Sequence, residues 1–226
     1  MSHFHAHPHA HPTDGATSAS EETEGRLIRW ASSYDLLTNV LTLGQASRLR
    51  KMTLDHALLK NGDAVLDVGC GTGAITIPAR QRVGAQGSAA GIDPSAEMIA
   101  VARQKAQRKG LDIDFRMGVI EALPYPTESF DVVTSSLMMH HLPAHLQVQG
   151  IAEIYRVLKP GGRLLIADLS SPKTSPRQHL LTALAMHRGS QSGVEDLQET
   201  LKGAGFREIT LIPQRFFIIG FVRAAK

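Results

Sequence analysis

Short apolar runs rich in branched residues alternate along the chain with longer segments in which apolar residues recur every three or four positions. The short runs predict buried strands, and the periodic segments predict amphipathic helices. The predicted strands are 64–68, 88–92, 113–116, 130–135, 163–169, 207–212 and 216–223. The predicted helices are 26–41, 47–59, 74–83, 94–109, 144–158, 177–187 and 194–204.

This alternation indicates an α/β fold. It predicts a Rossmann-like, mostly parallel sheet of seven strands with helices on both faces. Pro160, Gly161 and Gly162 are expected to end one helix before the fifth strand begins. Pro213 and Gln214 separate the last two strands, so they predict a turn and a C-terminal antiparallel hairpin at the edge of the sheet.

The composition is that of an ordinary globular protein, with 42% of the 226 residues hydrophobic and 20% charged. The formal net charge is only +3 and the Lys and Arg residues are scattered, so we expect no nucleic-acid partner. No apolar run reaches the roughly 20 residues of a membrane span. Cys70, the single cysteine, has no disulfide partner within the chain, and we expect a cytoplasmic protein.

Residues 1–25 differ from the rest and are predicted to form a disordered tail, because they offer no apolar periodicity to bury. The tail begins MSHFHAHPHAHP, with a histidine at every second position from His3 to His11. Such a segment can chelate a divalent metal without fixed geometry, or it can be a solvated tail or resemble a purification tag. We expect no catalytic metal site there.

The chemistry is expected where the first predicted strand ends. Gly69, Gly71 and Gly73 follow this strand and open a helix, so the chain can turn tightly there and approach a bulky ligand. Ligands of open parallel sheets bind beyond the carboxyl ends of the strands. Asp93 ends the second strand, where its carboxylate can accept both hydroxyls of a ribose.

Two cofactor classes share this layout, dinucleotides and S-adenosylmethionine. Dinucleotide sites favour the spacing G-x-G-x-x-G, whereas residues 69–73 read G-x-G-x-G. Asp67, just before the loop, would repel a pyrophosphate but suits the cationic end of an amino acid. The pattern favours S-adenosylmethionine; a glycine turn without a ligand would leave the two carboxylates at strand ends unexplained.

Four segments resemble successive motifs of class I S-adenosylmethionine-dependent methyltransferases. They are VLDVGCGTG, GIDPSAEMI, EALPYPTESFDVV and EIYRVLKPGGRLLIAD. The likeness covers residues 34–172 and is greatest to the ubiquinone/menaquinone-biosynthesis C-methyltransferase group. It implies a methyltransferase domain at 61–226, preceded by a helical lid on the substrate side at 26–60, and it implies a small-molecule methyl acceptor.

The resemblance also implies residue roles. Asp67 matches a residue near the methionine amine, Asp93 one that binds the ribose, Met98 one near the adenine and Tyr34 a lid tyrosine. The alternative for Tyr34 is an anchor for the first helix. The expected cofactor-binding residues are Tyr34, Asp67, Gly69, Gly71, Gly73, Asp93, Pro94, Met98, Val119, Ile120 and Ser135.

The sequence departs from the family at two points. Val119 stands where the family commonly has Asp or Asn to accept from the adenine amino group, so one side-chain hydrogen bond is missing. After the fourth strand the chain reads SSLMMHHLP instead of the Arg-Asn pair of the quinone enzymes. The resemblance therefore does not by itself assign a quinone substrate.

His140 and His141 follow the fourth strand, and one of them could act as a general base, since an imidazole can accept a proton near neutral pH; His140 is the named candidate. The alternative is a structural role in the loop. Leu137, Met138 and Met139 favour an apolar acceptor. A phospholipid amine as acceptor, a binding module without turnover and a metal-handling protein are the other functions considered, and the sequence does not define an oligomeric state.

Overall fold

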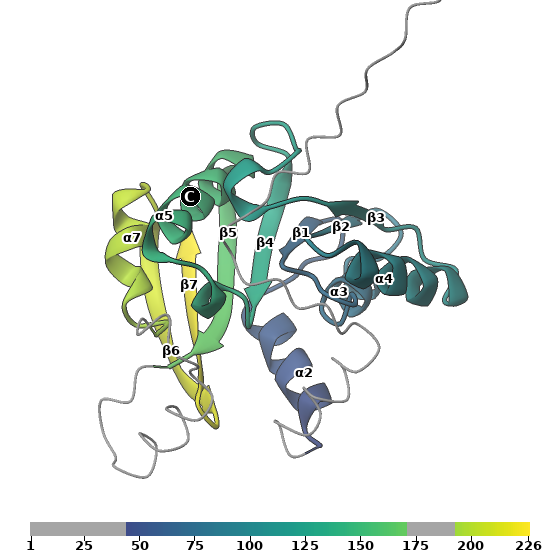
Figure 1. Cartoon of the computed structure of the whole chain (residues 1–226), viewed down its shortest axis with the longest axis horizontal. Helices are drawn as coiled ribbons and strands as arrows, with labels where there is room; N and C mark the ends of the chain where they lie inside the picture. The colour runs from purple at the N-terminus through teal and green to yellow at the C-terminus, as the bar shows by residue number, and fades with distance from the viewer. Residues whose placement is uncertain (1–43, 171–192) are drawn as a thin grey trace, which may run out of the picture.

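The structure, a computed structural model, describes residues 44–170 and 193–226. Within these residues seven strands form one sheet in the order β3-β2-β1-β4-β5-β7-β6 (Figure 1). The strands are β1 (Ala64–Val68), β2 (Ser88–Asp93), β3 (Asp114–Met117), β4 (Phe130–Ser136), β5 (Leu158–Leu169), β6 (Arg207–Phe216) and β7 (Ile219–Ala225). Strands β1 to β5 pair in parallel, whereas β7 runs antiparallel to both β5 and β6. The predicted fold class is confirmed.

Helices cover both faces of the sheet. They are α2 (Ala46–His56), α3 (Thr76–Arg82), α4 (Ala96–Arg108), α5 (Ala144–Val157) and α7 (Leu197–Gly203), with short 3-10 turns η1 (Ile120–Ala122) and η2 (Met139–His141). One buried cluster joins Ile151 of α5 and Leu201 of α7 to one face of the sheet. A second cluster joins Leu49 of α2 and Ala79 of α3 to the other face, and α4 packs beside α3.

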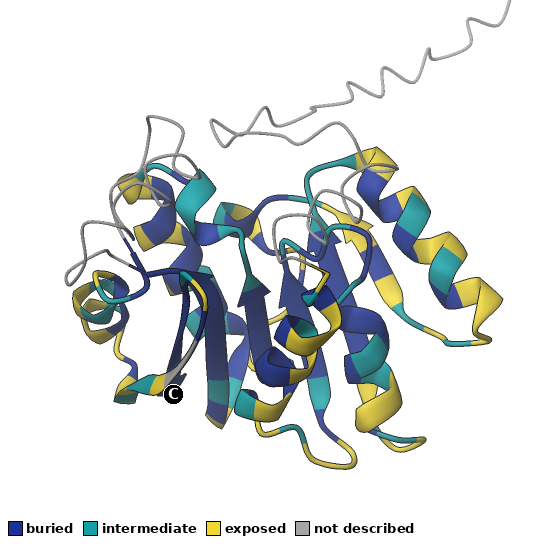
Figure 2. Cartoon of the chain, turned by 90° about the horizontal axis from the view of Figure 1, so that it is seen from below, coloured by how far each residue is buried: buried dark blue, intermediate teal, exposed yellow. Residues whose placement is uncertain are grey.

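The central strands are apolar because both of their faces are covered. In β1, Val65 belongs to the cluster under α2 and α3, whereas its neighbour Leu66 belongs to the cluster under α5 and α7. Both side chains are fully buried. The strands form a buried layer between helices whose outer surfaces are exposed (Figure 2). A continuous apolar run is therefore the expected sequence of such a strand.

Two predicted boundaries are wrong. The turn of the C-terminal hairpin lies at Phe217 and Ile218, not at Pro213 and Gln214, because β6 continues to Phe216 with an irregular register after Ile212. An edge strand tolerates a proline, which cannot donate to the ladder.

The second wrong boundary is the start of β5, which begins at Leu158 and includes the Pro-Gly-Gly segment 160–162. Leu158 pairs with Phe130, and the register shifts between Phe130 and Val132. The glycine-containing segment therefore lies in an irregular stretch of the strand, and it does not separate the helix from the strand.

Several expectations lie outside the described residues. These are the histidine-rich tail, the helices at 26–41 and 177–187, and Tyr34. In the part of the chain that is described, no helix is long and apolar enough to cross a membrane. The same residues contain no cluster of three or more His, Cys, Asp or Glu side chains that could hold a metal ion.

Candidate active site

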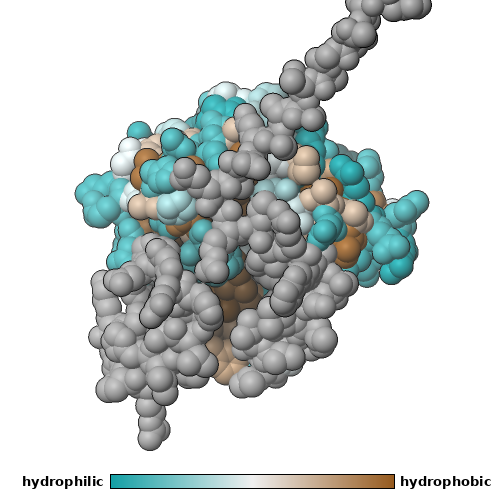
Figure 3. All heavy atoms as spheres, viewed as in Figure 1, coloured by the Kyte–Doolittle hydropathy of each residue, from teal (hydrophilic) through white to brown (hydrophobic). Residues whose placement is uncertain are grey.

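A cavity lies at the carboxyl ends of the central strands, beside the N-terminal half of α2. β1 is flanked by β2 on one side and by β4 on the other, so the strand order reverses there. This is the position at which open parallel sheets bind ligands. The space-filling view shows apolar residues on the same side, near the ends of β4 and β5 (Figure 3). The fold thus forms a ligand-sized site where the sequence predicted one.

The glycine loop after β1 forms one wall of the cavity. Gly69 and Gly71 both line it and both have a left-handed backbone, with φ of +73° and +50°. A Cβ atom on Gly69 would lie only 2.5 Å from Cγ of Met138, which comes from the loop after β4. The backbone N–H groups of Gly69 and Cys70 donate to the carbonyl of Ile92, so the loop is fixed to the end of β2. Only glycine fits at residue 69.

Gly73 has a different role, because it does not line the cavity. Its φ is +78°, and an added Cβ would lie within 3.3 Å of Phe115, Ile77 and Ala102. These side chains come from β3, α3 and α4. Gly73 therefore allows the start of α3 to pack closely against its neighbours, and it affects the cavity only through the position of the loop.

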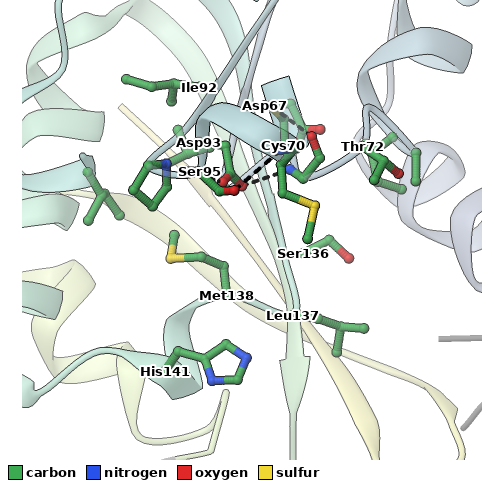
Figure 4. Close-up of a pocket in the computed structure, with 18 of the residues that line it drawn as sticks. Asp67, Cys70, Thr72, Ile92, Asp93, Ser95, Ser136, Leu137, Met138 and His141 are labelled. Carbon is green, nitrogen blue, oxygen red and sulfur yellow. Dashed lines mark hydrogen bonds between the residues drawn. The ribbon is translucent and has the colours of Figure 1, made fainter. Parts of the chain in front are cut away.

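Asp93 connects the end of β2 to the glycine loop (Figure 4). Its Oδ2 accepts from the N–H of Gly71 at 2.9 Å, and its Oδ1 accepts from the N–H of Ser95 at 2.9 Å. Burial raises the pKa of this carboxyl, and the two backbone donors oppose the rise. Each oxygen retains a further lone pair, so the carboxylate can still accept two hydroxyl groups from a ligand.

Asp67 lies deeper and is only 1% exposed. The hydroxyls of Thr76 and Thr134 donate to its two oxygens, at 2.7 Å and 2.9 Å. Burial raises the pKa of Asp67 to about 6, although the threonine hydroxyls favour the charged form. A cationic ligand next to this carboxyl would favour its ionisation.

An apolar slot continues from Asp93 toward β3. Met98 of α4 lines one part of it, and Val119 and Ile120 line another, with Pro94 nearby. Val119 offers no side-chain hydrogen bond, as the sequence indicated. Glu121 also lines this part of the cavity, and sequence reasoning did not single it out.

The opposite end of the cavity is lined by side chains from two distant segments. Leu49 and Arg50 come from α2, and Leu137, Met138 and Leu142 come from the segment after β4. Met139 is instead buried in the core, under α5. Leu137 has a left-handed backbone with φ of +56°, a conformation that costs a leucine free energy. The polar groups near these apolar side chains are the guanidinium of Arg50, the imidazole of His141 and the hydroxyl of Ser136.

The adjacent histidines are placed differently. His141 lines the cavity, whereas His140 does not. Nδ1 of His140 lies 2.5 Å from Oδ1 of Asp168, at the end of β5, and the backbone N–H of His140 donates to Oδ2 of the same carboxylate. The two imidazole rings lie 3.9 Å apart between centroids. Asp168 therefore holds the turn from which His141 reaches the cavity.

Eight expected cofactor-binding residues line the cavity together: Asp67, Gly69, Gly71, Asp93, Pro94, Met98, Val119 and Ile120. Ser135 does not, because it is fully buried and its neighbour Ser136 faces the cavity instead. Adjacent residues of a strand point to opposite faces, so a sequence that offers two serines does not decide between them without the register. Leu49, Arg50 and His141 also line the cavity and were not predicted to bind the cofactor.

The lining fits S-adenosylmethionine in shape and in charge. Gly69 and Gly71 present a backbone without side chains to the cavity, and this part of the loop would lie beneath a bound cofactor. The cavity is lined by three carboxylates, those of Asp67, Asp93 and Glu121, and by one guanidinium, that of Arg50. An excess of negative charge favours a cationic cofactor and disfavours the pyrophosphate of a dinucleotide.

Comparisons with known proteins agree with this geometry. Residues 65–162 match the family model described as a methyltransferase domain. A demethylmenaquinone methyltransferase of Shouchella clausii is 39% identical over 62% of the chain, and the match spans 59% of that protein. The ubiquinone/menaquinone biosynthesis C-methyltransferase UbiE of Yersinia pestis is 30% identical over 86% of the chain and 88% of its own length.

A solved S-adenosylmethionine-dependent methyltransferase from Aquifex aeolicus superposes with a TM-score of 0.66, over 86% of the chain and 97% of that structure. At 22% identity this match shows the shared fold alone. The sequence relatives show more. The chain belongs to the family of S-adenosylmethionine-dependent methyltransferases that includes the ubiquinone/menaquinone biosynthesis C-methyltransferases.

Proposed function

We propose that the chain transfers the methyl group of S-adenosylmethionine to a small apolar acceptor. The observation that carries this proposal is a cavity with two unlike ends. One end joins a glycine loop to two carboxylates, and the other is bounded by apolar side chains from α2 and from the segment after β4. A cofactor at the first end and an acceptor at the second would meet in one space, and this proximity supplies much of the rate of a direct group transfer.

The cofactor would be held mainly by two carboxylates and the loop between them. Asp93 would accept the ribose hydroxyls, because both of its oxygens have capacity left after their backbone hydrogen bonds. Asp67 already accepts from two threonine hydroxyls and is almost completely buried, so it would attract the methionine amine by its charge or through a water. When bound, S-adenosylmethionine supplies an electrophilic methyl group, so the task left to the protein is alignment.

The acceptor is proposed to be an apolar ring compound. Leu137, Met138 and Leu142 bound the end of the cavity that would receive it. The relatives are named for demethylmenaquinone and for ubiquinone and menaquinone biosynthesis, which supports an acceptor of this kind. Because the SSLMMHHLP segment lacks the Arg-Asn pair, the proposal specifies the apolar ring and not a particular quinone.

A base is required only if the acceptor atom carries a proton. The acceptor would then give up this proton to the base while its electron pair takes up the methyl group that the cofactor would supply. His140 was the candidate from the sequence. We assign the proton to His141, which lines the cavity, and a positioning role to His140, which Asp168 holds.

Three variants test the histidine roles. With an acceptor that must lose a proton, His141→Ala is expected to lower kcat about 100-fold and to remove the acidic limb of the pH–rate profile. His140→Ala should have a smaller effect on kcat and leave cofactor affinity unchanged. His145→Ala is the control, because this histidine is exposed on α5. Unchanged turnover in His141→Ala would remove the residue from the mechanism.

The cofactor assignment is tested by calorimetric titration with S-adenosylmethionine and, separately, with NADH. Saturable binding of the first alone, lost in Asp93→Ala, is the expected result. Selective binding of NADH would overturn the proposal.

Acceptors are then compared by transfer of a labelled methyl group to demethylmenaquinone and to phosphatidylethanolamine vesicles. Labelling of the ring compound supports the proposal, whereas labelling of the headgroup would show a phospholipid methyltransferase. Tight cofactor binding with no transfer would favour a binding module; the comparisons favour neither alternative. We place the enzyme in the cytoplasm, and fractionation of cells tests this.

A further inference from the structure

Gln147 is a buried polar residue to which no role has been assigned so far. It lies in the first turn of α5 and is only 4% exposed. Its Nε2 atom donates to the carbonyl of Met139 at 3.0 Å and to the carbonyl of Leu142 at 3.1 Å. Both acceptors are carbonyl oxygens, so the NH₂ group of the amide must face them. One side chain thus binds the residue at which the turn η2 begins and the residue that follows this turn.

The two carbonyls that Gln147 binds lie on either side of the histidine pair. Met139 precedes His140, and Leu142 follows His141. Within the turn, the N–H of Leu142 donates to the carbonyl of Met139. The hydrogen-bond geometry of a short 3-10 turn is poorer than that of an α-helix. Side chains of the neighbouring elements therefore help to determine where the two imidazoles lie.

The turn is held from two sides, by β5 and by α5. On the β5 side, Asp168 accepts from the backbone N–H of His140 and contacts its ring. On the α5 side the anchor is Gln147, and its helix is fixed in the core, where Ile151 is fully buried. Asp168 thus holds the histidine that does not line the cavity. Gln147 holds the two ends of the turn from which His141 reaches the cavity (Figure 4).

We propose that Gln147 is a positioning residue for proton transfer, because it fixes the turn that carries His141 into the cavity. The inference rests on the proposed function, in which His141 takes the proton of the acceptor. A base acts only within hydrogen-bonding reach of the proton that it removes. A displacement of about 1 Å can lower a rate about 100-fold, so loss of the hydrogen bonds that hold the turn should be visible in kcat.

Three variants at two positions of α5 measure the effect. Gln147→Met removes both hydrogen bonds but keeps an unbranched side chain, and it should lower kcat about tenfold with an acceptor that must lose a proton. The Kd for S-adenosylmethionine should stay unchanged. Gln147→Glu keeps one side-chain oxygen and lacks the NH₂ group, so it should also lower kcat. Gln149→Met is the matched control, because this glutamine is exposed on the same helix, and it should leave kcat unchanged.

A double-mutant cycle distinguishes a positioning role from a merely structural one. His141→Ala leaves no imidazole to position, so adding Gln147→Met to it should change kcat by less than about twofold. An equal loss in both backgrounds would overturn the inference, as would an unchanged kcat in Gln147→Met. Turnover is expressed per cofactor-binding site from the calorimetric titration, so partial unfolding does not mimic a lower kcat.

Hydrogen exchange of the cofactor-free protein gives a readout that does not depend on turnover. In Gln147→Met, exchange of the N–H groups of His141 and Leu142 should be at least about tenfold faster, because the turn opens more often. Gln149→Met should leave it unchanged. Unchanged exchange in Gln147→Met would overturn the inference alone. Failure of the wild type to bind S-adenosylmethionine, or unchanged turnover in His141→Ala, would instead overturn the proposed function and with it the base that Gln147 is inferred to position.

Discussion

At the cofactor end of the cavity the backbone shapes the site, whereas at the acceptor end the shape comes from side chains that are far apart in the sequence. At the cofactor end, the N–H of Gly69 donates to the carbonyl of Ile92, and the N–H of Gly71 donates to the carboxylate of the next residue, Asp93. Leu49 and Leu142, by contrast, come together only because α2 and the segment after β4 meet above the sheet. The first end is locally determined and the second depends on tertiary packing.

This difference indicates which changes each end tolerates. An end that is built from the backbone loses its shape when a single glycine or carboxylate changes, because the loop and the end of β2 are fixed to each other by hydrogen bonds. A side-chain-built end can exchange one apolar residue for another of similar volume at small cost. We therefore expect the cofactor end to be sensitive to substitution and the acceptor end to be adaptable in specificity.

The largest effect is expected from Asp93→Ala. The substitution removes the acceptor for the N–H groups of Gly71 and Ser95 as well as the proposed ribose contact. Each hydrogen bond to a charged group contributes about 1.5–3 kcal/mol, so the Kd for S-adenosylmethionine should rise at least about 100-fold. Calorimetry measures it. A change of less than about tenfold would show that Asp93 does not hold the loop and the ligand together.

Gly69→Ala should disturb both ends at once. The new Cβ meets Met138 at 2.5 Å and the residue must keep a φ of +73°, so we expect a loss of about 2–4 kcal/mol in the free energy of unfolding. Gly110→Ala is the control, with φ of +63° and no atom within 4 Å of the added Cβ, and should lose only about 1 kcal/mol. Urea unfolding gives both values. Equal losses would mean that the contact with Met138 does not matter.

Asp67→Asn is expected to stabilise the ligand-free protein at neutral pH. Burial raises the pKa of Asp67 from 3.8 to about 6. Between these values the folded protein binds more protons than the unfolded chain, so stability falls as the pH rises through this window. The variant should therefore gain about 1–3 kcal/mol at pH 7, and the gain should vanish below about pH 4. A gain that is independent of pH would contradict this linkage.

The smallest effect on stability is expected at the acceptor end, from Leu137→Asn. Asparagine tolerates the left-handed φ of +56° better than leucine, and this offsets the lost apolar contact to within about 1 kcal/mol. KM for an apolar acceptor should rise several-fold while the Kd for S-adenosylmethionine stays unchanged. If both constants change together, the two ends are not separable.

The fold could be predicted largely because its central strands are buried on both faces. Val65 and Leu66 belong to a continuous apolar run, which is typical of a strand covered on both faces. The glycine turn that follows this strand is determined by residues close to it in the sequence. The hairpin turn was misplaced because Pro213 is acceptable in an edge strand, and a sequence does not show which strand lies at the edge.

The site residues could also be predicted only in part. Asp67, Gly69 and Asp93 were predicted from spacing, because strand ends and a loop place them by local geometry. Glu121 also lines the cavity, and it was missed because the sequence does not show which side chains of the turn η1 face the cavity. His140 was preferred over His141 because the sequence does not show which of two adjacent side chains in a 3-10 turn faces the cavity.

The acidic lining of the cavity has a consequence for the release of the spent cofactor. Methyl transfer converts the positively charged sulfonium into a neutral thioether. Asp67 and Asp93 would attract the charged form more strongly than the neutral one, and the difference is larger in a buried site than in water. The proposed transfer would therefore weaken the attraction between these two carboxylates and the spent cofactor, and so favour its release.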